Sequence, residues 1–100
     1  MKTPKEMTTE EKVEIARNPD TPVEILEILS RDKDWYVRYY IAGNPNTSVK
    51  VLENLLKDGE WIVTAAVTSN PNLPVSVLEE MSKSTDGTIR FLADNNLDKR

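Results

Sequence analysis

The sequence predicts an all-helical protein in which one short structural unit is repeated along the chain. The dipeptide Asn-Pro begins at Asn18, Asn44 and Asn70, and a lone Asn96 follows, so that successive asparagines lie 26 residues apart. A fixed period of about 20 to 50 residues is typical of repeat proteins. Each unit carries two runs of apolar residues at helical spacing, which predicts two helices per unit. We therefore expect an α-solenoid, a row of paired helices stacked on one another.

The repeat accounts for the whole chain of 100 residues as a single helical-repeat domain. A half repeat covers residues 8–17, full repeats cover 18–43, 44–69 and 70–95, and a polar tail covers 96–100. Thr8 and Glu11 have the spacing of a capping box at the start of the first helix. Seven helices are expected, with no linker and no second domain.

Within the first full unit, Thr21 suits the N-cap of the first helix, with Glu24 completing a capping box and Pro22 in the first helical position. This helix is expected to end near Arg31, and Asp34 to open the second helix. The predicted buried stripe of the first helices consists of Val23, Ile25, Leu26 and Leu29, then Val49, Val51, Leu52 and Leu55 or Leu56, then Val75, Val77, Leu78 and Met81. That of the second helices consists of Val37 with Ile41, Val63 with Val67, and Ile89 with Ala93.

The Asn-Pro pair predicts where each second helix ends, because a residue before proline is kept out of the α region. Gly43 fits the C-terminal turn position in the first unit. An asparagine side chain readily bonds neighbouring backbone, and its repetition predicts a ladder of such side chains. We interpret Asn18, Asn44, Asn70 and Asn96 as architectural.

Composition excludes most catalytic chemistry. The chain has no cysteine and no histidine, which excludes disulfides, thiolate metal sites, most zinc chemistry and the usual Ser-His and Cys-His pairs. Its glycines, Gly43, Gly59 and Gly87, are isolated and form no phosphate loop. No apolar run suits a membrane span or a signal peptide. We expect a cytoplasmic protein that is not an enzyme and needs no cofactor or metal.

The pattern NPxTPxxxLxxL, followed by Asp-Trp-x-Val-Arg and a helix rich in small residues, resembles the leucine-rich repeat variant family, which is related in style to HEAT and armadillo repeats. The resemblance covers residues 9–96 and is strongest in NPDTPVEILEIL with DWYVRYYIAGNP. It implies a right-handed superhelix of paired helices that offers an extended face to a partner. The iron–sulfur cluster known in the family is held by cysteines outside the repeats, so it does not carry over. Gly87 stands where Trp35 and Trp61 do, and looser packing is expected there.

Several repeated residues are interpreted as structural. Glu27 with Arg31, Glu53 with Lys57, and Glu79 with Lys83 have the spacing of solvated helix-surface ion pairs. Arg38 and Arg90 lie four residues after Asp34 and Asp86, and the resemblance to HEAT-like repeats implies that such Asp–Arg pairs tie units together. Trp35 and Trp61 recur at one repeat position, which favours packing between units.

The candidate binding site lies where the first unit departs from the others. All three tyrosines, Tyr36, Tyr39 and Tyr40, fall within five residues of its second helix. Tyr40 is expected to point inward, because Ala66 and Leu92 share its position. Tyr36 and Tyr39 are expected on the exposed face with Arg38 between them, a composition typical of interface hot spots. An alternative is that they cover the thin end of the solenoid. The candidate partner-binding residues are Tyr36, Arg38, Tyr39, Tyr40 and Ile62.

These observations predict a non-catalytic protein- or peptide-binding module, a scaffold or adaptor in the style of bacterial and phage proteins. One alternative is a nucleic-acid-binding protein, for which Lys33, Arg38, Lys50 and Arg90 would have to converge despite a net charge of −4. Another is a structural protein that self-associates through its ends, where Phe91 and Leu92 lie; otherwise the chain is expected to be a monomer. No membrane partner is expected.

Overall fold

A computed structural model describes residues 2–100, and every regular element in this range is a helix. The range contains no strand and the seven α-helices that the repeat predicts. They are α1 (Thr9–Arg17), α2 (Val23–Leu29), α3 (Trp35–Gly43), α4 (Val49–Leu55), α5 (Trp61–Thr68), α6 (Val75–Met81) and α7 (Gly87–Asp98), preceded by a 3₁₀ turn, η1 (Pro4–Glu6). Within residues 2–100, none of these helices has both the length and the apolar character that crossing a membrane requires.

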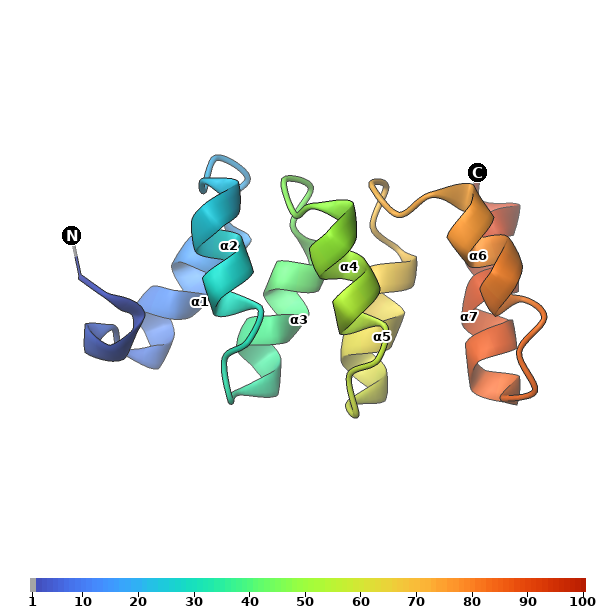
Figure 1. Ribbon diagram of the computed structural model, residues 1–100, viewed down its shortest axis with the longest axis horizontal. Coiled ribbons are helices and arrows are strands. Elements are labelled where there is room, and N and C mark those ends of the chain that lie inside the picture. The colour runs from blue at the N-terminus through green and yellow to red at the C-terminus, as the bar shows by residue number, and fades with distance from the viewer. Residues whose placement is uncertain (1) are drawn as a thin grey trace.

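The helices lie side by side along the longest dimension of the molecule, which measures 43 × 23 × 18 Å. Figure 1 shows α2, α4 and α6 in front of α1, α3, α5 and α7. Helix α3 packs between α1 and α5, and each even-numbered helix packs against the odd-numbered helix that follows it. The pair α6–α7 stands apart from α5 in Figure 1, and α7 contacts α5 less extensively than α3 does. This agrees with the looser packing predicted for the third unit.

The core is built from aliphatic side chains alone. Val37 and Ile41 of α3 are fully buried, as are their counterparts Val63 and Val67 of α5. The remaining buried apolar residues are Ala16, Leu26, Leu29, Ala42, Val51, Leu52, Leu55, Leu73, Leu78 and Ala93. The predicted stripe is too wide in one respect, because the first valine of each even-numbered helix (Val23, Val49 and Val75) is 38 to 44% exposed.

Buried asparagines join consecutive units, as the sequence predicts. Asn44 is 2% exposed, and its amide nitrogen donates to the carbonyls of Ala16 (2.7 Å) and Asn18 (2.9 Å) in the preceding unit. Asn70 repeats this arrangement with the carbonyls of Ala42 (2.7 Å) and Asn44 (2.9 Å). Each asparagine oxygen accepts from the backbone N–H two residues further on, at 2.8 Å. All donor capacity of these amides is therefore used, and each one fixes a unit to its neighbour.

The last position of the ladder is different. Leu97 replaces proline, so α7 continues through Asn96, whose amide donates to the Thr68 hydroxyl (3.0 Å) instead of to the turn. The Arg100 guanidinium takes over the vacant role and donates to the carbonyls of Asn70 (2.8 Å) and Leu73 (2.6 Å). The prediction that Asn96 forms an equivalent rung is therefore wrong.

The turns between units correct two further predictions and confirm a third. Thr21 is not an N-cap: α2 begins at Val23, and the Thr21 hydroxyl reaches back across the turn to the Ile15 carbonyl (2.7 Å). Gly43 has no positive φ and is the last residue of α3, which ends because Asn44 is extended. At the first helix, the capping box of Thr8 is formed as predicted.

Candidate interaction surface

Every aromatic side chain of the protein lies outside the core. The chain has two tryptophans, three tyrosines and one phenylalanine, and no buried core position holds any of them. The tyrosines are half-buried over the core, whereas Trp35, Trp61 and Phe91 are 41%, 66% and 67% exposed. The buried core therefore contains no aromatic side chain, and the aromatic residues lie over it or at the surface.

Four of these aromatic residues share one side of α3, because positions 35, 36, 39 and 40 span less than half of a helix circumference. Trp61 lies on α5 at the repeat position of Trp35. We call these five residues, Trp35, Tyr36, Tyr39, Tyr40 and Trp61, the aromatic face. On α3 the rings pack edge to face in two pairs, with centroids 5.7 Å apart for Trp35–Tyr36 and 5.1 Å apart for Tyr39–Tyr40.

The interpretation of the tryptophans as spacers between units is wrong. Trp35 and Trp61 are the first residues of α3 and α5. At these helix ends the neighbouring unit leaves them 41% and 66% exposed. Their recurrence reflects a repeated surface and not a repeated core.

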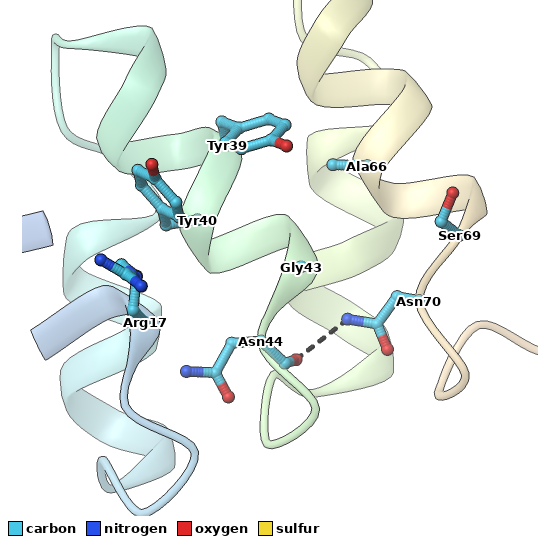
Figure 2. A pocket seen from close by; sticks show the side chains of 8 residues that line it. All are labelled: Arg17, Tyr39, Tyr40, Gly43, Asn44, Ala66, Ser69 and Asn70. Atoms are coloured by element: carbon cyan, nitrogen blue, oxygen red, sulfur yellow. Dashed lines mark hydrogen bonds between the residues drawn. The ribbon is translucent and has the colours of Figure 1, made fainter. Parts of the chain in front are cut away.

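Two adjoining hollows accompany the aromatic face. The α3–α5 hollow, of about 370 Å³, is lined by Arg17, Tyr39, Tyr40, Gly43, Asn44, Ala66, Ser69 and Asn70 (Figure 2). The α1–α3 hollow, of about 570 Å³, is lined by Thr9, Glu10, Val13, Glu14, Arg17, Tyr36 and Tyr40.

The hollows separate the two tyrosines that the sequence analysis places together. Tyr36 lines only the α1–α3 hollow, and Tyr39 lines only the α3–α5 hollow. Tyr40 borders both, so it does not point wholly inward as predicted. Ile62, at the repeat position of Tyr36, is half-buried against the core and lines neither hollow. The site is thus one continuous surface with Tyr40 at its centre.

Small residues create the α3–α5 hollow. Ala66 stands at the repeat position that Tyr40 and Leu92 occupy in the other units. Gly43 has no side chain, and a Cβ placed on it would meet no atom within 4 Å. The space beside Tyr39 and Tyr40 is therefore open because these two positions are small.

Arg17 lies where the two hollows meet and was not among the predicted site residues. Its guanidinium carbon is 5.6 Å from the centre of the Tyr40 ring, a cation–π contact. None of the ion pairs within residues 2–100 involves Arg17. The sequence held a signal for it, because the same repeat position is occupied by Gly43, Ser69 and Asn95. An arginine there departs from the repeat as clearly as the tyrosines do.

Arg38 is engaged in an ion pair with a different partner from the one predicted. Its guanidinium contacts Asp58 of the next unit, with Nε–Oδ2 2.6 Å and Nη2–Oδ1 3.2 Å, and not Asp34. It also donates to the carbonyls of Asp32 (2.8 Å) and Lys33 (3.1 Å). The expected role, tying units together, is found for Arg38 but not for Arg90, which donates to the Ser84 carbonyl of its own unit (2.9 Å). The guanidinium of Arg38 is therefore not free to meet a partner beside the tyrosines, because its Nε, Nη1 and Nη2 atoms donate to Asp58 and to these carbonyls.

The same link occurs one unit earlier. Lys12 and Asp32 occupy the repeat positions of Arg38 and Asp58, and Nζ lies 2.8 Å from Oδ2. Both pairs are largely buried, with side chains 15% and 8% exposed in the first and 18% and 9% exposed in the second. The third pair of positions holds Thr64 and Ser84, which carry no charge. Charged links therefore join the first units but not the last.

These ion pairs shift the pKa values of their members. Burial alone would raise the pKa of Asp58, but hydrogen bonds from Arg38 and from the Glu60 N–H outweigh it, and the pKa is lowered. Asp32 behaves alike: hydrogen bonds from Lys12 and the Asp34 N–H outweigh burial and lower its pKa. The hydrogen bond to Asp32 raises the pKa of Lys12. All these charges stay ionised at neutral pH.

The surface pairs predicted on the even-numbered helices form only in part. Glu27 and Arg31 pair at 3.3 Å, whereas Lys83 approaches Glu80 at 3.6 Å instead of Glu79. The basic residues required for nucleic-acid binding lie on different elements. Lys50 lies on α4 and Arg90 on α7. Arg38 is paired with Asp58.

Comparison of the chain with known protein families, with curated proteins and with solved structures found no match. The surface is therefore interpreted from its own geometry and chemistry.

Proposed function

We propose that the protein is a non-catalytic repeat module, a short α-solenoid that binds a protein or peptide partner on the aromatic face. The observation that carries the proposal is the distribution of aromatic residues: all of them lie outside an entirely aliphatic core. Tyrosine and tryptophan are enriched at the centres of protein interfaces, and contiguous exposed apolar patches on monomers mark binding sites. The resemblance to the leucine-rich repeat variant family supports the proposal, because a right-handed superhelix of that kind presents an extended face.

The free energy gained by burying the exposed tryptophans indicates how much of the aromatic face a partner has to cover. A large aromatic ring buries about 200 Å² at about 25 cal/mol per Å². Covering the exposed part of Trp61 (66%) then contributes about 3 kcal/mol, and that of Trp35 (41%) about 2 kcal/mol. Association itself costs at least about 4 kcal/mol. Two tryptophans alone barely offset that cost, so the partner also has to contact the tyrosines and the hollows.

The chemistry of the hollows favours binding over catalysis. Their only carboxylates are those of Glu10 and Glu14, and both side chains are exposed. General acids and bases are typically titratable groups held in a water-excluded site. Neither hollow buries a carboxylate.

The experiment is affinity capture from the native host with three forms of the protein. These are the wild type, a double variant with Tyr36→Ala and Tyr39→Ala, and a control with Ile28→Ala. Ile28 is 49% exposed on α2, so its replacement removes exposed apolar surface away from the aromatic face. Circular dichroism verifies that all three forms fold. Partners should be lost with the double variant and kept with the control; recovery of the same partners by the double variant would refute the proposal.

A further inference from the structure

Charged side chains of opposite sign follow one another along α1 beside the two hollows. Arg17 lies at their junction, held over the Tyr40 ring and making no ion pair within residues 2–100. Glu10 and Glu14 line the α1–α3 hollow, and they too form none of the ion pairs in this part of the chain. Because these three residues are spaced four and three apart on α1, they share one side of the helix. The surface therefore offers two carboxylates, then a guanidinium.

The α3–α5 hollow lies beyond Arg17 and has a mixed lining. Tyr39, Tyr40, Gly43 and Ala66 supply its apolar wall, whereas Asn44, Ser69 and Asn70 add polar groups, and Figure 2 shows Arg17 on the opposite side of the hollow from Ala66 and Ser69. Its volume of about 370 Å³ exceeds that of any amino-acid side chain. It has room for one large apolar side chain beside a group that pairs with Arg17.

The length of the path fits a short extended peptide. Glu10 and Arg17 are about 10 Å apart along α1, at about 1.5 Å per residue. Crossing from α3 to α5 adds about 8 to 10 Å, the usual distance between packed helices. At about 3.3 Å per extended residue, the whole path of about 20 Å corresponds to about six residues.

We propose that the partner binds through an extended segment of about six residues that carries an acidic side chain for Arg17. An apolar side chain two positions to one side enters the α3–α5 hollow, and a basic side chain two positions to the other side meets Glu10 and Glu14. Side chains two positions apart in an extended chain point the same way and are about 6.6 Å apart along it, and the reach of the long basic and apolar side chains covers the rest of the distance to Glu10 and to the hollow. The inference rests on the proposed function and specifies its ligand. Glu10, Glu14 and a net charge of −4 disfavour a nucleic-acid phosphate backbone as the occupant.

Selection of a random 12-residue peptide display library against the full chain tests the motif. Enriched sequences should carry an acidic residue with a large apolar residue and a basic residue two positions away on opposite sides. The best synthetic peptide is then titrated by calorimetry. Arg17→Glu should weaken it at least tenfold, while Arg31→Glu, a charge reversal on α2 outside both hollows, should change affinity less than twofold. A peptide whose acidic residue is replaced by lysine should regain affinity for the Arg17→Glu variant.

Gly43→Leu gives a second test. Because Gly43 lines the hollow and no atom lies within 4 Å of a Cβ placed on it, a leucine side chain at this position is expected to occupy the hollow. Peptide affinity should fall at least tenfold while the unfolding midpoint stays within a few degrees.

The outcomes separate this inference from the proposed function. Enriched peptides without the acidic residue, or equal affinities for the two arginine variants, overturn the inference. If those peptides are still lost with Tyr36→Ala and Tyr39→Ala, the proposed function stands without it. If their binding survives that double variant, both are wrong. A library that yields no enriched peptide overturns the inference. The proposed function is then tested by the affinity capture from the native host alone.

Discussion

Replacing Asn44 with alanine removes the first of the two rungs of the asparagine ladder, and the structure sets the expected cost. The side chain donates to the carbonyls of Ala16 and Asn18 and accepts from the Asn46 N–H, and it is 2% exposed. Without it the buried Ala16 carbonyl loses a partner, at about 1 to 2 kcal/mol. The other two groups are partly buried, so water compensates in part and each loss costs about 0.5 to 1 kcal/mol. The sum is about 3 kcal/mol.

Urea unfolding followed by circular dichroism measures this change. With a slope of about 2 kcal/mol per molar urea, the midpoint should fall by about 1.5 M. Asn18→Ala is the matched control, because Asn18 occupies the same repeat position but is exposed, and its side chain accepts one hydrogen bond, from the Asp20 N–H (2.9 Å). Its replacement should cost less than about 1 kcal/mol.

The comparison is informative only if the slope is unchanged, since an altered slope signals a different unfolded state or an intermediate. With equal slopes, similar midpoints for the two variants would refute the reasoning, because the ladder bonds would then add nothing to stability.

Three other predictions concern stability. Gly43→Ala should stabilise the protein by about 0.4 to 1 kcal/mol in urea unfolding, because Gly43 has helical backbone angles and open space around it; a loss of stability would contradict this. Arg38→Thr and Asp58→Ser should each destabilise, yet the double variant should cost at least about 1 kcal/mol less than their sum, and additivity would show that the pair does not couple. The lowered pKa values of Asp32 and Asp58 mean that these carboxylates stabilise the fold above the usual aspartate range and lose that contribution as the pH falls through it. The urea midpoint should therefore fall on acidification from about pH 5, less steeply in Asp58→Asn than in the wild type.

The sequence predicted the framework well because its strongest signals are periodic. The Asn-Pro spacing located the ends of α1, α3 and α5 and the ladder that joins the units. It failed at Asn96, where Leu97 lets α7 continue and Arg100 supplies the missing donor. Arg100 replaces the asparagine as hydrogen-bond donor from a position outside the repeat, so the 26-residue period does not reveal it.

Neither the resemblance to HEAT-like repeats nor the spacing of Asp34 and Arg38 identifies the partner of Arg38. Asp34 lies one turn away, but Asp58, in the turn of the next unit, is the residue that Arg38 contacts. A signal was present in the repeat itself: Thr64 and Ser84, the equivalent pair one unit later, have both lost their charges. When two repeat positions lose their charges in the same unit, the residues at those positions in the other units are candidates for a contact.

The candidate site was predicted in part. The departures at Tyr36, Tyr39 and Tyr40 identify the helix, but Arg17 departs from the repeat as clearly and is absent from the predicted site. Trp61 was misassigned for a different reason. Recurrence alone does not distinguish a position that is repeatedly buried from one that is repeatedly exposed.

The aliphatic core has a consequence for spectroscopy. Both tryptophans already face water in the folded protein, at 41% and 66% exposure. Unfolding therefore changes the surroundings of Trp61 little, whereas Trp35 loses the cover of its larger, buried part. A ligand on the aromatic face would move the exposed parts of both indoles out of water and shift their emission to shorter wavelength. Trp61 thus serves as an unlabelled optical reporter that responds more to occupancy than to folding.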